Sequence, residues 1–127
     1  MRLVLRLATA VLVAWNGSVH LRLWRDGYKA IDDVGVLFLV NVIVAAVLAV
    51  AVLAKPVPVV LAAVVAFSAG SLVALVLSRT DGGFLGFMEA GWSEDAKQAL
   101  VSEVGAILTA GTLLVLGLRH PQVAIDR

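Results

Sequence analysis

The chain has 127 residues, of which 61% are hydrophobic and only 15% charged, with a mean hydropathy of +1.02 and a formal net charge of +1. This composition is far from that of a soluble domain and indicates an integral membrane protein. A bilayer core about 30 Å thick needs roughly 20 mainly apolar residues per helix, so the length accommodates about four spans and excludes a separate soluble domain.

Four apolar runs predict four transmembrane helices in one domain over residues 1–127. We expect them over about residues 3–23, 34–54, 57–78 and 94–118. The first begins like a signal peptide, but three further spans follow it, so we expect a retained span. The second and third are apolar on every side, whereas barrel strands would alternate apolar and polar residues. The predicted fold class is an all-α integral membrane protein, an up-down bundle of four transmembrane helices with short loops.

The connections predict how these helices follow one another. Pro56 and Pro58 stop helix continuation and form a tight hairpin, so the second and third helices should be antiparallel neighbours. Ser93 precedes Glu94 and Asp95, a pattern typical of a helix N-cap with acidic residues in the first turn. The fourth helix should therefore begin there.

One longer connection, over residues 79–98, is not purely polar. Phe84, Phe87, Met88 and Trp92 recur at helical spacings, which indicates a short interfacial helix or turn with Trp92 as an anchor. The alternative is a lid over a pocket, which would have the same pattern. The other aromatic residues at the predicted interfaces are interpreted as anchors as well: Trp15, Trp24 and Tyr28.

Charge gives a weak indication of orientation. Lys and Arg divide equally between the two predicted faces, so the positive-inside rule is nearly tied. All acidic residues except Asp126 lie on the face away from the termini. We therefore predict a multi-pass protein of the cell membrane with both termini in the cytoplasm and the longer loops outside.

Polar residues of the first helix form one stripe. Arg6, Thr9, Val13, Asn16 and His20 follow steps of three and four residues, which places them on one helix face. An amide or imidazole without a partner in hydrocarbon costs several kcal/mol, so this face should contact other helices.

The remaining helices contain matching polar positions. Asn41 is the polar residue within the second helix. Small and hydroxyl residues on the other two helices let backbones approach, and we interpret them mainly as packing stripes. They are Ser68, Ser71, Leu75 and Ser78 on the third helix, and Ser102, Gly105, Thr109 and Thr112 on the fourth.

Up-down topology brings several polar residues to one depth, in the outer half of the membrane. The candidate ligand-binding residues are Asn16, His20, Asn41, Arg79 and Glu103. Glu103 lies inside an apolar run, and an ionisable residue at such a depth is a functional hypothesis by default. We expect His20, Arg22 or Arg79 as its partner. The cluster is then either a structural ion pair or a polar pocket open to the outer face.

Several kinds of chemistry are not supported. His20 and His120 lie at opposite predicted faces, so one chain cannot hold a haem between two histidines. Cysteine is absent, and one histidine with scattered carboxylates is too little for a metal site. Gly82-Gly83 lacks the Lys-Ser/Thr of a phosphate loop, and no basic nucleic-acid patch is present. We expect no cofactor, no metal and no nucleic-acid partner.

The segment GSVHLRLWRDGYKAIDDVGVLFL, residues 17–39, resembles small four-helix membrane proteins of actinobacteria and, more distantly, the DoxX-like group. The resemblance covers about a fifth of the chain and implies a four-helix bundle. It implies no catalytic residues, because the activity of such families is poorly defined. The residues that carry it are His20, Leu21, Leu23, Trp24, Gly27, Tyr28, Val34, Gly35, Phe38 and Leu39.

Three functions compete at this point. The first is a structural or accessory subunit, without enzymatic activity, that associates with itself or with a larger membrane complex. The second is a small oligomeric transporter, channel or ligand-binding membrane protein that uses the polar cluster. A membrane-embedded enzyme acting on a lipid or quinone is the third.

Overall fold

The computed structural model describes residues 1–120 and contains four long helices and one short 3-10 helix, with no strand among these residues. The elements are α1 (Arg2–Arg25), η1 (Tyr28–Ala30), α2 (Asp32–Ala54), α3 (Pro58–Leu77) and α4 (Glu94–Arg119). Each long helix is long and apolar enough to cross a membrane. The prediction of four such helices is confirmed, with bounds within two residues of those expected.

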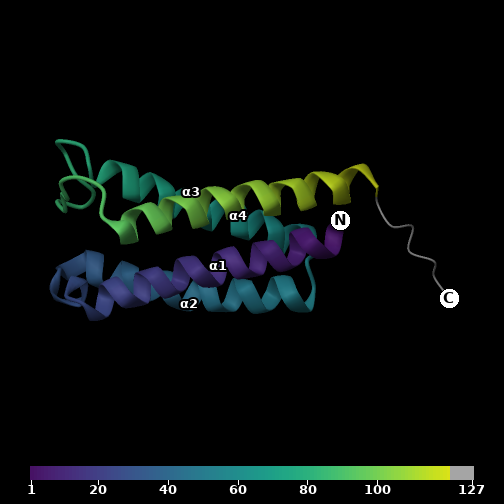
Figure 1. The fold of residues 1–127 in the computed structure, drawn as a ribbon, viewed down its shortest axis with the longest axis horizontal. Helices are drawn as coiled ribbons and strands as arrows, with labels where there is room; N and C mark the ends of the chain where they lie inside the picture. Colours follow the sequence, from purple (N-terminus) through teal and green to yellow (C-terminus); the bar gives the residue numbers. More distant parts are fainter. Residues whose placement is uncertain (121–127) are drawn as a thin grey trace.

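The helices run alternately up and down. α1 and α4 lie side by side, α2 packs on α1, and α3 packs on α4 (Figure 1). The N-terminus and the end of α4 lie at one end of the bundle, whereas η1 and the connection over residues 78–93 lie at the other. We call this second end the loop end.

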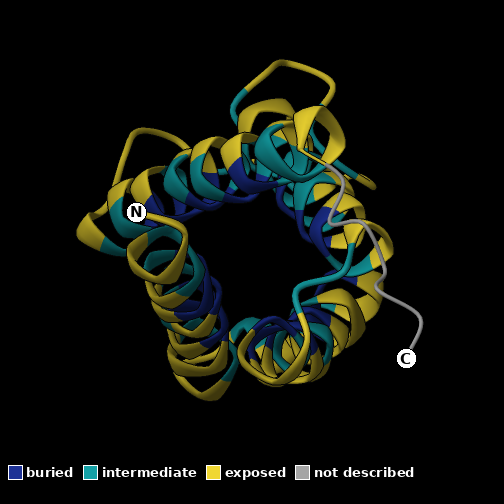
Figure 2. Ribbon diagram, turned by 90° about the vertical axis from the view of Figure 1, so that its right-hand side faces the viewer, coloured by how far each residue is buried: buried dark blue, intermediate teal, exposed yellow. Residues whose placement is uncertain are grey.

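Buried positions line the inside of the ring of helices, and exposed positions face outward (Figure 2). The half of the bundle nearer the termini has an apolar core, in which Val13, Val52 and Val64 are almost fully buried, and a second pocket opens at its end beside Arg2 and Arg6. The outward surfaces remain apolar, with Val47, Val59 and many similar side chains exposed. This distribution is the one expected of helices that face lipid.

Close helix contacts follow the predicted stripes. Gly17 allows α1 to approach α2, because a Cβ at this position would lie 2.8 Å from the Cβ of Ala45. Thr9 joins α1 to α4 by a hydrogen bond of 2.9 Å to Thr109. Thr112, expected on the same inward stripe of α4, is exposed, because ten residues of helix turn it about 80° away from the buried Ser102.

α2 and α3 are antiparallel, as the Pro56–Pro58 hairpin predicts, but they contact each other far less than the other neighbouring helices do. We call this loosely packed boundary the α2–α3 seam. The predicted N-cap of α4 is confirmed, since the Ser93 side chain accepts a hydrogen bond from the Ala96 amide.

Candidate functional site

A cavity of about 270 Å³ lies in the half of the bundle nearer the loop end. Its walls come from all four long helices, with most of them supplied by α2 and α3 on either side of the seam. Val40 and Gly70 line it and are exposed, so the cavity reaches the bundle surface at the seam. The predicted polar cluster therefore borders a space.

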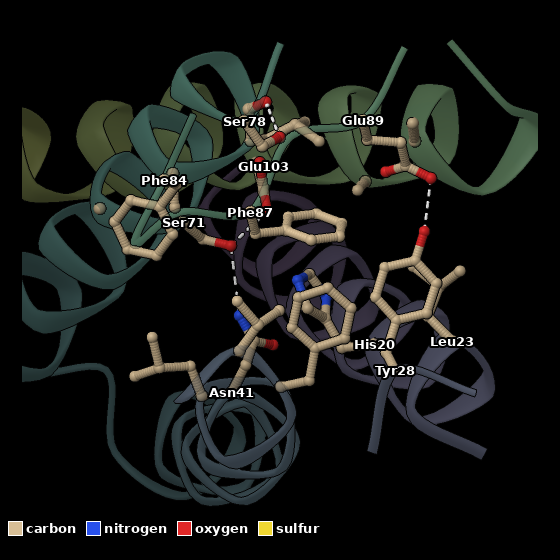
Figure 3. A pocket seen from close by; sticks show the side chains of 18 of the residues that line it. His20, Leu23, Tyr28, Asn41, Ser71, Ser78, Phe84, Phe87, Glu89 and Glu103 are labelled. Carbon is tan, nitrogen blue, oxygen red and sulfur yellow. Dashed lines mark hydrogen bonds between the residues drawn. The ribbon is translucent and has the colours of Figure 1, made fainter. Parts of the chain in front are cut away.

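A chain of hydrogen bonds crosses the cavity wall from α2 to α4. The amide nitrogen of Asn41 donates to the Ser71 hydroxyl at 3.2 Å, and Ser71 donates to Glu103 Oε1 at 2.5 Å (Figure 3). Because the Ser71 proton is used on the carboxylate, Asn41 must contribute its NH₂ group to this chain. The amide oxygen of Asn41, Oδ1, and the second carboxylate oxygen of Glu103, Oε2, are buried and have no partner among the described residues.

Glu103 has no cationic partner among residues 1–120, so the expected pairing with His20, Arg22 or Arg79 is wrong. Arg22 instead pairs with Asp95 at 2.6 Å, and Arg79 pairs with Glu89 at 3.4 Å. Glu103 is 1% exposed and is the largest of the fully buried side chains. The carboxyl group of Glu103 is therefore enclosed by the protein, and its one hydrogen-bond donor is the Ser71 hydroxyl.

His20 lies in the cavity wall on α1. Its Nδ1 is 2.9 Å from the Asn16 carbonyl oxygen, and its ring meets Phe38 edge-on at 5.0 Å. A carbonyl oxygen can only accept, so Nδ1 carries the proton in this hydrogen bond. In the neutral ring Nε2 is then left as an acceptor.

Arg79 lies at the rim of the cavity, where α3 ends. Its guanidinium donates to the Leu75 carbonyl and the Ser78 hydroxyl, at 3.0 and 2.7 Å. The group also stacks over the Trp92 ring at 4.6 Å, while its buried Nε has no partner among the described residues. Together with Glu89, these contacts hold the cation away from Glu103.

Residues 78–93 form turns that cover the loop end of the cavity. Phe84 and Phe87 line the cavity, and their backbones exchange hydrogen bonds of 2.9 and 2.8 Å. The segment contains no helix, so the helical spacing of its aromatic residues places them in a turn. This arrangement matches the lid interpretation for Phe84 and Phe87, whereas Met88 and Trp92 remain exposed at the surface.

Tyr28 joins the lid to η1. Its hydroxyl donates to Glu89, and its ring stacks on Phe38 with centroids 5.1 Å apart, so this tyrosine belongs to the cavity wall (Figure 3). Burial raises the pKa of Tyr28 to about 12, and the hydrogen bond to Glu89 adds to the shift. The phenol therefore stays protonated and keeps donating at neutral pH.

We expect the lid contact to weaken between pH 10 and pH 12. Because the pKa of Tyr28 is raised above its ordinary value near 10, its contribution to stability is complete below pH 10 and is lost as the pH rises toward 12. The chain has a single tyrosine, so tyrosinate absorbance measures this group directly. Glu89→Gln should lower the midpoint but leave it above 10, because burial is the larger cause. A midpoint near 10 in the unchanged protein would contradict the docked tyrosine.

Four of the five predicted site residues line the cavity: His20, Asn41, Arg79 and Glu103. Asn16 does not line the cavity; it lies one helical turn before His20, and the Ser102 hydroxyl is within hydrogen-bonding distance of its amide oxygen at 3.4 Å. The role of Ser71 as the link between Asn41 and Glu103 was not predicted, because its spacing equally fits a packing stripe. Tyr28 and Glu89 were not predicted as site residues either, because their contact across the loop end leaves no local pattern.

The arrangement can hold a small molecule through hydrogen bonds at one end and apolar contact along its body. Among the described residues no cluster of His, Cys, Asp or Glu is suited to a metal ion. The resemblance of residues 17–39 to DoxX-like proteins stays a prediction. Comparisons with protein-family models, curated proteins and solved structures found no match to this chain.

Proposed function

We propose that this protein is a multi-pass membrane protein that binds a hydrophobic molecule with a polar head, admitted from the bilayer through the α2–α3 seam. The observation that carries the proposal is the enclosed, unpaired carboxylate oxygen of Glu103 in the cavity wall. A buried polar atom without a partner costs about 1–3 kcal/mol. Such a cost is retained where a ligand supplies the missing contact.

The surface of the bundle supports a location within lipid. Large apolar side chains cover the outside of all four helices, and charged residues concentrate at the two ends. The acidic loop end favours placing both termini in the cytoplasm and the cavity in the outer half of the cell membrane. Glu103 would then lie roughly 14 Å along α4 from its start, within the hydrocarbon region.

The shape of the interior favours binding over conduction. The cavity ends at the apolar core in the other half of the bundle, where Val13, Val52 and Val64 are packed among neighbouring helices. The lid covers the loop end with Phe84 and Phe87. The seam is then the route by which a molecule dissolved in the bilayer reaches the polar groups.

The competing proposal of an accessory subunit is consistent with a purely structural Glu103, as one half of an ion pair that fixes the bundle. That role needs a cation to hold the carboxylate, and the nearby arginines pair with Asp95 and Glu89 instead. A structural element would also be expected to satisfy both carboxylate oxygens. The missing hydrogen bond at Glu103 Oε2 therefore favours a ligand-binding role for this residue over a structural one.

Photolabelling in liposomes tests the proposal. The probes are two alkyl chains that carry a diazirine, one with an alcohol head and one with an amine head. We expect labels from at least one probe to concentrate on cavity-lining peptides of α2 and α3. Gly70→Phe places a ring at the mouth of the cavity and should suppress this labelling, since a Cβ at Gly70 meets no atom within 4 Å and the fold should persist.

Gly111→Phe is the matched control. This glycine also has free space around its Cβ position, but it lies on α4 away from the cavity. It should leave the labelling pattern unchanged. Labels spread evenly over the lipid-facing surfaces, or an equal effect of the two substitutions, would overturn the proposed function.

A further inference from the structure

We infer that the head of the bound molecule is a cationic amine, recognised by Glu103 and Asn41. This inference rests on the proposed function and deepens it by naming the ligand class. It is carried by the balance of charge in the cavity wall and by the kind of polar atom that the wall leaves open.

The charge of the cavity wall is unbalanced. The formally charged side chains that line it are Arg79 and Glu89, which pair with each other, and Glu103, which has no counter-charge among residues 1–120. His20 is the remaining titratable group of α1 at the wall, and Tyr28 that of η1. A cation beside Glu103 would make the enclosed set neutral, whereas an anion would add repulsion in a medium of low dielectric.

The open atoms of the Asn41–Ser71–Glu103 chain are acceptors, whereas the open donor of the wall, Arg79 Nε, lies at the rim beside Glu89. Glu103 Oε2 and Asn41 Oδ1 are both buried without partners, and both residues are more than nine-tenths buried. An ammonium group has only donors, three of them, and so matches a wall that offers acceptors. An alcohol has one donor, and a carboxylate head has none.

The remainder of the wall fits an apolar body. Phe38 and Phe67 line the cavity from α2 and α3, and Phe84 and Phe87 line it from the lid. Aromatic faces also attract a cation through the negative face of the ring. The cavity is slightly smaller than the roughly 300–1,000 Å³ of typical ligand sites, so it would hold the head and first part of a chain whose end stays in the lipid.

Competition for photolabelling tests the head group. Unlabelled alkyl amine, alcohol and carboxylate of one chain length compete against each diazirine probe in liposomes. Because a hydrogen bond to a charged group is stronger than a neutral one, we expect the amine to compete at least about tenfold more effectively than the alcohol. The carboxylate should be the weakest competitor.

Glu103→Gln should abolish this preference, with a roughly tenfold loss for the amine and little change for the alcohol. Glu94→Gln is the matched control, because it removes a carboxylate from the same helix at an exposed position paired with Lys97. Labelling by the alcohol probe shows that the cavity is still formed. Cavity labelling without an amine preference, or with a preference that survives Glu103→Gln, would overturn this inference and leave the proposed function standing. Absence of cavity labelling by either probe would overturn the proposed function itself.

Discussion

Gly17→Ala should destabilise the protein even though alanine is the better helix former. The added Cβ would lie 2.8 Å from the Cβ of Ala45, closer than real Cβ contacts allow, so α1 and α2 must separate. Overpacking of this kind costs about 1–3 kcal/mol, against a gain of up to about 1 kcal/mol in helix propensity. The measurement is the unfolding midpoint in mixed micelles titrated with a denaturing detergent.

Two variants separate the contact from a general effect of the substitution. Gly111→Ala adds the same methyl group to a helix position with no atom within 4 Å, so it should not destabilise. Ala45→Gly combined with Gly17→Ala moves the methyl group across the interface and should restore a stability near that of the unchanged protein. Failure of this combined variant to recover would contradict a direct contact at this point.

The same contact matters for the site. His20 lies one turn from Gly17 on α1, and Asn41 lies one turn from Ala45 on α2. Separation of these helices would therefore move two parts of the cavity wall relative to each other. We consequently expect Gly17→Ala to weaken labelling of the cavity as well as stability.

The helices could be predicted from the sequence because lipid leaves little choice. Backbone groups in hydrocarbon must be satisfied within the segment, so a long apolar run such as that of α2 becomes a helix whatever its valine content. The inward face of α1 was predictable for a related reason. Thr9, Asn16 and His20 recur at helical spacing, and all three are buried.

The partner of Glu103 could not be predicted in the same way. Depth placed Glu103 near Asn41 and Arg79, but depth does not determine which direction a side chain takes around the bundle axis. Ser71 and Glu103 meet because α3 packs on α4, and hydroxyl residues at such spacing also serve plain helix packing. The sequence alone could therefore not decide whether Glu103 pairs with a cation or borders a cavity without one.

The cavity depends on a feature that no local pattern encodes. α2 and α3 are joined by a tight hairpin, which predicts neighbours, yet their packing is loose along the seam. The lid is positioned by the long-range contact between Tyr28 and Glu89, whose sequence separation hides it from periodicity. A cavity that opens at the α2–α3 seam and is covered at the loop end therefore becomes visible only in the three-dimensional arrangement of the helices.

Glu103→Met should raise the stability of the ligand-free protein. The substitution removes a buried carboxyl group whose Oε2 has no partner and replaces it with an apolar side chain of similar length. Ser71 would lose its acceptor, but a helical hydroxyl can donate to its own backbone, as Thr112 does to the Leu108 carbonyl at 2.7 Å. We therefore expect a gain of about 1–3 kcal/mol, measured by the same unfolding titration.

Thr9→Val is the contrasting variant, because it removes a hydrogen bond that joins α1 to α4 without bordering the cavity. Polar contacts between membrane helices contribute about 0.6 kcal/mol on average, so this variant should lose stability by a similar amount. Opposite signs for the two substitutions would show that Glu103 is kept at a cost to the fold, as a binding residue would be. A loss of stability in Glu103→Met comparable to that in Thr9→Val would instead show that Glu103 stabilises the helix bundle, which would support an accessory subunit.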